Sequence, residues 1–361
     1  MERHARRWRT VCARGCDNSG SAPGPDRVGA ALHGSCAGGK PKPSSVAERR
    51  DRVILIAGGT GTLGTHVVRL LAARGFHVRV LTRDSSRAQH LEDELVEIAL
   101  GDVRDPDAVA RAMAGADTVI SAIHGFGDAG DYNPRTVDYE GNTVLIQAAR
   151  AAGVQHFILV SVQGAAADHP IELFRMKYLA EQELNGSGIP WTILRPTAFM
   201  ETWADVVAKP LLETGKTRLF GRGLNPINFV SAWDVARFIE MTVIDASLRG
   251  KVLEVGGPKN LTMREFVRTF ETVTGRTGAT RHVSLPLMRV MSILMRPIKP
   301  ALAGQIQAAV VMDTRDMTAD ESATSRTYPS ITPTSLEEFA RGVHAAASPA
   351  VSTSIPRRRS A

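Results

Sequence analysis

The sequence predicts an α/β protein with a doubly wound parallel sheet, followed by a smaller C-terminal lobe. From Arg52 onward, short runs rich in β-branched and aliphatic residues alternate with segments of helical length. Strict alternation of this kind predicts right-handed βαβ units. The runs are almost continuously apolar, which is typical of strands buried on both faces of a parallel sheet. A chain of 361 residues is long enough for such a core.

Six strands and the helices between them make up the alternating part, which we expect to form one domain over residues 51–200. The predicted strands are Val53–Ala57, His77–Thr82, Leu95–Leu100, Thr118–Ala122, His156–Ser161 and Trp191–Leu194. The predicted helices are Thr62–Arg74, Asp107–Ala114, Tyr139–Ala152 and Pro170–Asn185.

Beyond Pro196 the alternation gives way to loops, short helices and isolated strands, which predicts a substrate lobe over residues 201–340. We expect the strand near residues 252–255 to return to the main sheet. Two apolar, Met-rich stretches, Leu287–Met295 and Pro300–Met312, are predicted to be core or lobe-packing helices. A lid, a dimer face or a membrane-surface contact is the alternative.

The net charge of +7 belongs to the two ends of the chain. Residues 1–50 carry ten Lys or Arg against four Asp or Glu, and three arginines stand at 357–359, which leaves the body two charges negative. Such a body lacks the basic footprint of a nucleic-acid-binding protein. Residues 1–50 are poor in aliphatic side chains, so we predict disorder there and in a tail over 341–361. A transit peptide is one interpretation of the basic start, and an extended or misassigned start is the one we prefer.

All three cysteines, Cys12, Cys16 and Cys36, lie in the N-terminal stretch. The body therefore cannot hold a disulfide framework, a thiolate nucleophile or a Cys-ligated zinc, and we expect a reducing cytoplasm. No His, Asp and Glu grouping has metal-ligand spacing, so no metal is predicted. No run reaches the roughly 18 apolar residues that a membrane span needs.

A glycine-rich turn follows the first strand and opens the first helix. Gly58 can adopt backbone angles closed to other residues, Gly61 allows a pyrophosphate to approach the main chain, and Gly64 allows close packing of helix and strand. The helix start offers N–H groups and a partial positive charge to the phosphates. The spacing therefore predicts a Rossmann-type dinucleotide site, whose expected contacts are Gly58, Thr60, Gly61, Thr62, Leu63 and Gly64.

The end of the second strand bears on the choice of cofactor. Arg83 stands where an arginine can pair with the 2′-phosphate of NADP, whereas an acidic residue there would bind the ribose of NAD. Arg83 favours NADP(H) over NAD(H), and the adjacent Asp84 keeps NAD(H) open.

Two further strand ends complete the predicted cofactor site. Asp102 and Val103 follow the third strand, where a carboxylate can accept a hydrogen bond from the adenine amino group. Ser121 and Ala122 end the fourth strand, and these small side chains leave room beside the cofactor. Ligands of open α/β sheets bind at such carboxyl ends.

Several stretches together resemble a known family. They are the glycine turn, Gly101-Asp102, Val137–Asn142, Ala151–Val154, Ile193–Pro196, Asp234–Ala236 and Leu261-Thr262 with Glu265. This set resembles the atypical, extended short-chain dehydrogenase/reductases, and within them the NmrA-like NAD(P)H-binding proteins. The resemblance covers roughly residues 52–265 and implies that the backbone around Pro196 lies near the nicotinamide.

The resemblance also identifies the candidate catalytic residues. Ser161 and Lys177 match the serine and lysine of the short-chain dehydrogenases, but Leu173 stands where the tyrosine acid/base should be. Tyr178 is at the wrong spacing to replace it. Lys177 has two predicted roles, which are binding the nicotinamide ribose or acting as the acid/base itself. His124 is a weaker candidate after the fourth strand.

Two functions remain open at this point. The first is an NADPH-dependent reductase of a small carbonyl, quinone or activated alkene, because a conjugated acceptor tolerates the missing tyrosine. The alternative is a non-catalytic NADP(H)-binding redox sensor or accessory/assembly protein. The sequence does not identify the substrate, and a homo-oligomer or a protein partner is left open.

Overall fold

The central sheet has seven parallel strands, as shown by a computed structural model that describes residues 52–91, 93–126 and 130–347. The predicted disorder over residues 1–50 lies outside the described residues. In their order across the sheet the strands are β10 (Lys251–Val255), β6 (Trp191–Pro196), β5 (His156–Val160), β4 (Ala116–Ser121), β1 (Val53–Ala57), β2 (His77–Thr82) and β3 (Val96–Leu100). The predicted doubly wound sheet is confirmed, and β10 is the expected returning strand, since it pairs in parallel with β6.

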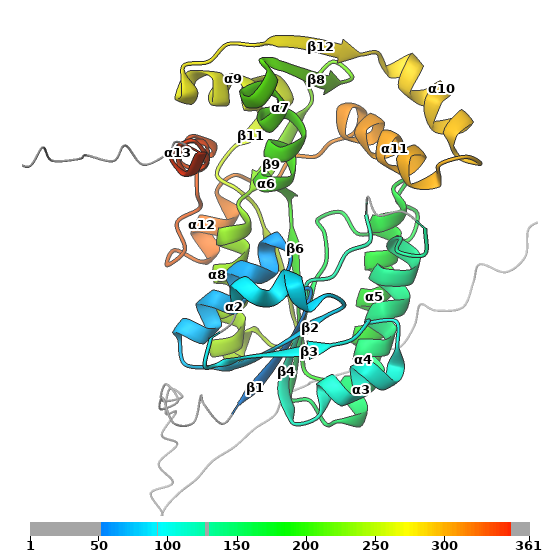
Figure 1. Ribbon diagram of the computed structural model, residues 1–361, viewed down its shortest axis with the longest axis vertical. Helices are drawn as coiled ribbons and strands as arrows, with labels where there is room; N and C mark the ends of the chain where they lie inside the picture. Colours follow the sequence, from blue (N-terminus) through cyan, green and yellow to red (C-terminus); the bar gives the residue numbers. More distant parts are fainter. Residues whose placement is uncertain (1–51, 92, 127–129, 348–361) are drawn as a thin grey trace, which may run out of the picture. The chain divides into compact units, whose positions relative to one another are not determined.

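Helices cover both faces of this sheet (Figure 1). Alternate residues of β1 point to opposite faces: Ile54 and Ile56 pack with one helical layer, Leu55 and Ala57 with the other. The first layer consists of α2 (Thr62–Ala73) and α8 (Ala232–Ile244). The second consists of α3 (Pro106–Met113), α4 (Asn142–Ala151) and α5 (Glu172–Gly186). Burial on both sides explains why the strands read as continuous apolar runs.

Short helical segments connect these layers. A 3₁₀ helix, η1 (Ser85–Leu91), follows β2, and a second, η4 (Ala246–Leu248), precedes β10. A π-helix, η2 (Pro134–Gly141), leads directly into α4. The predicted helix over Tyr139–Ala152 is therefore an α-helix preceded by a π-helical turn.

The smaller lobe combines two short sheets with helices. Its strands are β7 (Ala198–Phe199), β9 (Pro226–Val230) and β11 (Asn260–Thr262) in one sheet and β8 (Lys216–Phe220) and β12 (Ala279–Val283) in the other. Its helices are α6 (Met200–Trp203), η3 (Ala204–Ala208), α7 (Lys209–Thr214), α9 (Met263–Thr274), α10 (Leu285–Met295), α11 (Pro300–Thr314), α12 (Ala323–Thr327) and α13 (Leu336–Ala347).

The last helix corrects one boundary. We predicted a disordered tail from residue 341, but α13 continues to Ala347. Ala340 is fully buried, and Phe339 and Val343 pack beside it against the core of the lobe. An amphipathic face thus holds the helix in place; residues 348–361 lie outside the described residues.

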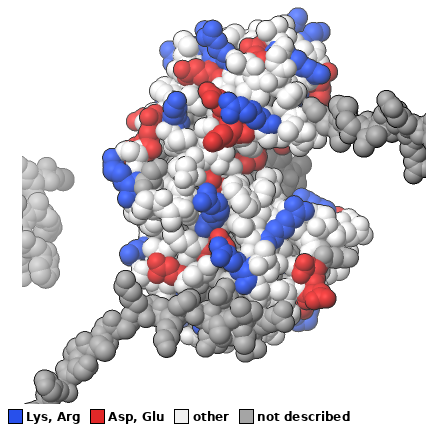
Figure 2. Space-filling model, turned by 90° about the vertical axis from the view of Figure 1, so that its left-hand side faces the viewer, with Lys and Arg blue, Asp and Glu red and all other residues white. Residues whose placement is uncertain are grey.

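The surface charge and the helix lengths complete the description. Figure 2 shows the face formed by α2, α8, α12 and α13, on which acidic and basic side chains are interspersed. None of the helices within the described residues is long and apolar enough to cross a membrane.

Candidate cofactor site

The glycine turn has the geometry of an anion-binding helix start. Gly58 has a φ of +87°, and Gly61 N–H donates to its carbonyl at 3.1 Å. A Cβ on Gly64 would lie 2.1 Å from the same carbonyl oxygen, so helix and turn touch without room for a side chain. No described side chain caps α2, and its first turn contains no acidic residue. Its first N–H groups therefore remain available to a phosphate.

A cleft of about 490 Å³ opens beside this turn. Seven of the predicted contact residues line it, namely Gly58, Thr60, Gly61, Arg83, Asp102, Val103 and Ala122. The structure adds residues that the sequence did not single out for the cofactor, namely Thr82, Arg87, Tyr132 and Val137, together with His124.

Other predicted contacts are not among the described residues that line the cleft. Thr62, Leu63 and Gly64 belong to the start of α2. The Ser121 hydroxyl is buried and donates to Asn142 Oδ1 at 2.6 Å. The Pro196 carbonyl accepts a hydrogen bond from Gln163 N–H at 2.9 Å.

One end of the cleft is organised around Tyr132. The guanidinium carbons of Arg83 and Arg104 each lie 3.8 Å from the centroid of its ring. The Tyr132 hydroxyl donates to Asp102 Oδ2 at 2.7 Å, and Arg104 pairs with the same oxygen at 3.0 Å. Partial burial by itself would raise the pKa of Asp102, but hydrogen bonds from Arg104 and Tyr132 outweigh it and lower the pKa to about 2. Asp102 is thus in the cleft as predicted, with both oxygens already bonded to protein groups.

The charges after β2 form a basic site. Arg83 and Arg87 are both exposed and both line the cleft. Asp84 also lines the cleft, and its Oδ1 accepts hydrogen bonds from the backbone N–H and the hydroxyl of Ser86, at 2.9 and 2.6 Å. The Ser86 hydrogen bonds lower the pKa of Asp84. Asp84 therefore closes a local turn at the start of η1, and the two arginines leave this end of the cleft with a net positive charge.

Lys177 is enclosed by oxygen atoms. Its ammonium donates to the Ile123 carbonyl at 2.8 Å and to the Val160 carbonyl at 3.0 Å. It also lies 2.9 Å from Asp138 Oδ1; this is an ion pair without hydrogen-bond alignment, since that oxygen accepts no hydrogen bond from the described residues. Both side chains are buried. Lys177 is not among the described residues that line the cleft.

The ion pair fixes the loop after β4. Lys177 holds the Ile123 carbonyl, and Asp138 Oδ2 accepts a hydrogen bond from Gly125 N–H at 2.8 Å. His124 lies between these two attachment points and lines the cleft. The pair thus positions the backbone on either side of a cleft residue. From the sequence, Asp138 was identified only within the family-like stretch Val137–Asn142 and was assigned no role.

Ser161 lies in a different buried network. Its hydroxyl donates to Glu181, whose carboxylate also binds the guanidinium of Arg195 through two hydrogen bonds, at 2.9 and 2.5 Å. Ser161 and Lys177 are therefore close to the same strand end but engage separate partners.

The position of the missing tyrosine is apolar. Leu173 packs in a cluster with Ile171 and Phe174 of the α5 region and with Ala308 and Val311 of α11. Because α11 comes from the lobe, this cluster joins the lobe to the sheet domain beside the loop after β5.

Comparison with known proteins agrees with this architecture. A model of the NmrA-like family matches residues 50–340. The chain belongs to the NmrA-like family. Two relatives of this NmrA-like protein are the NAD(P)H azoreductase of Xenophilus azovorans, 29% identical over 254 residues (70% of this chain, 81% of the relative), and the photosystem II assembly factor Ycf39 of Trieres chinensis, 28% identical over 245 residues (66% and 74%).

Solved structures share the fold of this NmrA-like chain. An NADPH-dependent quinone oxidoreductase from Escherichia coli, in complex with NADPH, superposes with a TM-score of 0.65 at 21% identity, over 80% of this chain and 99% of the other. The triphenylmethane reductase of a Citrobacter species, in complex with NADP(H), gives a TM-score of 0.64 at 19% identity, over 81% and 99%. At these identities the likeness establishes the fold.

Proposed function

We propose that this NmrA-like protein is an NADP(H)-dependent reductase of a conjugated acceptor such as a quinone, an activated alkene or a small carbonyl compound. The choice of NADP(H) as the cofactor rests on one observation: an uncapped, glycine-lined helix start lies in the same cleft as Arg83 and Arg87. The helix start suits a pyrophosphate, and the two guanidiniums suit the 2′-phosphate that distinguishes NADP from NAD. Asp84 lines the same cleft, but one of its oxygens already accepts two hydrogen bonds from Ser86, and the two arginines outnumber its single charge.

The choice of a conjugated acceptor as the substrate rests on the apolar cluster around Leu173. No phenol is available there to exchange a proton with an alcohol, and the neighbours Phe174 and Val311 are apolar. Hydride transfer to a conjugated acceptor spreads the developing negative charge over several atoms, so it depends less on an acid at one oxygen. The overall change is acceptor plus NADPH plus a proton giving reduced acceptor plus NADP⁺. The proton comes from water or from His124.

Lys177 and Ser161 take different parts in this proposal. Lys177, paired with Asp138, positions the loop that carries His124, and Ser161 maintains its contact with the Glu181–Arg195 pair. These roles replace the ribose-binding and acid/base roles that the family pattern suggests, because both side chains are already held by buried partners. A cytoplasmic location remains a prediction from the cysteine-free body.

The test combines binding with turnover. Thermal shifts with NADP⁺, NADPH, NAD⁺ and NADH rank the cofactors, because a ligand that binds only the native state raises Tm by mass action. NADPH oxidation is then followed with quinones, enones and, because one relative is named as an azoreductase, azo dyes. Tight NADPH binding with repeated turnover of one acceptor class supports the proposal. A larger shift with NAD(H) than with NADP(H) would contradict it.

One observation favours a second candidate, a non-catalytic NADP(H)-binding sensor or assembly protein. Lys177 and Ser161 are both committed to buried contacts, and another relative is named as a photosystem II assembly factor. In that case NADPH and NADP⁺ both bind, but no acceptor is reduced beyond the uncatalysed rate. Multiple turnovers exclude this candidate.

A further inference from the structure

The helical hairpin of α10 and α11 carries a concentration of exposed aliphatic side chains. Of α10, all of which the structure describes, only Met288 is buried. Half of the large hydrophobic side chains that are exposed in the described part of the chain lie within residues 287–302, and Ile293 (71%) and Ile298 (68%) are the most exposed of all. The aliphatic patch consists of Leu287, Val290, Met291, Ile293, Leu294 and Ile298.

The charge around the aliphatic patch has one sign. Residues 272–312 contain five Lys or Arg and no Asp or Glu. Arg289, Arg296 and Lys299 are exposed and stand beside members of the patch in the chain. The face in Figure 2, by contrast, mixes both signs. Uncompensated cations next to aliphatic side chains complement a lipid surface, which offers acyl chains and negative headgroups together.

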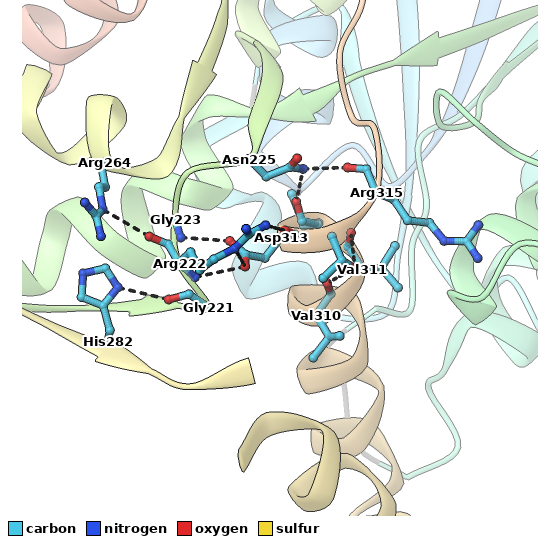
Figure 3. A network of polar contacts seen from close by, with 12 residues as sticks. Gly221, Arg222, Gly223, Asn225, Arg264, His282, Val310, Val311, Asp313 and Arg315 are labelled. Atoms are coloured by element: carbon cyan, nitrogen blue, oxygen red, sulfur yellow. Dashed lines mark hydrogen bonds and ion pairs between the residues drawn. The ribbon is translucent and has the colours of Figure 1, made fainter. Parts of the chain in front are cut away.

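The hairpin is firmly attached at its inner end (Figure 3). Asp313, near the end of α11, accepts hydrogen bonds from the backbone N–H groups of Arg222 and Gly223, at 3.0 and 2.9 Å. Asn225 donates to the carbonyls of Met312 and Arg315. These contacts join α11 to the turn between β8 and β9. The exposed face of α10 is therefore presented by a fixed support.

We propose that the aliphatic patch inserts into the surface of a bilayer that contains anionic lipids, with Arg289, Arg296 and Lys299 at the headgroups. A second copy of the chain is a poorer occupant, because two-fold pairing of this face would bring like charges together. A protein partner would have to present an apolar surface bordered by acidic side chains, and the vesicle experiment below separates this case from a bilayer.

This placement has a consequence that rests on the proposed function. Ala308 and Val311 of α11 pack against Phe174 in the cluster that contains Leu173. The hairpin that contacts lipid therefore also packs, through α11, against the apolar cluster around Leu173. A lipid-soluble quinone would then reach the protein from the bilayer, whereas the cofactor enters from water.

The primary test needs no enzymatic activity. The full chain is sedimented with vesicles of phosphatidylcholine alone or with 30% phosphatidylglycerol, on the order of the anionic fraction that attracts basic segments. We expect cosedimentation with the anionic vesicles, weakened by salt. Ile293→Glu/Leu294→Glu should lower the partition coefficient at least about tenfold, because it removes buried apolar area and adds repulsion. Ile244→Glu, at an exposed position at the end of α8, should bind as the native chain does.

Three results would overturn the proposal. One is that the native chain stays in the supernatant with anionic vesicles. Another is that the double variant sediments like the native chain, which would assign the binding to the basic ends that all variants retain. The third is a dimer in analytical ultracentrifugation that the double variant dissociates. If the double variant no longer reduces a vesicle-embedded quinone but still reduces a water-soluble one, docking is linked to activity. If the native chain binds the vesicles but reduces neither quinone, the result counts against the proposed function alone.

Discussion

Removing the ammonium of Lys177 should destabilise the protein strongly, because Asp138 would be left as an unpaired charge. Asp138 is fully buried, and its second oxygen accepts only the Gly125 N–H among the hydrogen bonds described for it. Breaking a buried ion pair by removing one partner costs about 3–5 kcal/mol. For a chain of this size each kcal/mol corresponds to a change in Tm of roughly 2 °C, so Lys177→Met should lower Tm by at least about 6 °C.

The double variant separates the charge effect from packing. Asp138→Asn/Lys177→Met contains neither charge, so most of the lost stability should return, with a coupling free energy of about 2 kcal/mol or more in a double-mutant cycle. Urea unfolding measures each free energy. A loss below about 1 kcal/mol for Lys177→Met, or strictly additive effects, would refute the buried pair. The NADPH affinity of the double variant then reports whether the loop at His124 depends on the Lys177–Asp138 ion pair for its position.

The remaining predictions concern the cofactor cleft and the core. Arg83→Ala and Arg87→Ala should each weaken NADPH binding by about tenfold or more and leave NADH unchanged, since a hydrogen bond to a charged group contributes about 1.5–3 kcal/mol; equal losses for both nucleotides in calorimetric titration would exclude the 2′-phosphate contact. Gly64→Ala should destabilise the fold, because its Cβ would meet a carbonyl oxygen at 2.1 Å, whereas Gly61→Ala, with a nearest contact of 3.4 Å, should fold normally and lose NADPH affinity; equal Tm values for the two variants would contradict this. Burial lowers the pKa of His156 to about 4, so its neutral form contributes stability that is present above pH 6.5 and is lost as pH falls toward 4; His156→Gln should flatten that part of the stability profile, and an unchanged slope would show that another group titrates.

Local patterns were sufficient to predict the sheet and the glycine turn. The first two strands have the predicted bounds because each is a short apolar run next to glycine or polar residues. Gly58, Gly61 and Arg83 line the cleft, and the sequence could point to them because each stands at a set distance along the chain from a strand end. Arg87 could have been found in the same way, four residues after Arg83.

Long-range contacts explain what the sequence did not reveal. Tyr132 and Asp138 enter the site from a loop and a π-helix whose sequence carries no signal for their partners. The roles suggested for Lys177 and Ser161 came from a family pattern, but the partners that hold these side chains are set by the three-dimensional packing. Similarly, α13 was shortened in the prediction because only its contact with the lobe core shows that it remains helical to Ala347.

The packing of α11 on Leu173 limits what a single substitution at this position can do. A tyrosine placed at residue 173 would not by itself create an alcohol dehydrogenase, because Leu173 packs in an apolar cluster with Phe174 and Val311 that a larger ring would have to displace. Several changes on two helices would have to occur together. Converting this chain to alcohol chemistry would therefore require repacking two elements as well as replacing one side chain.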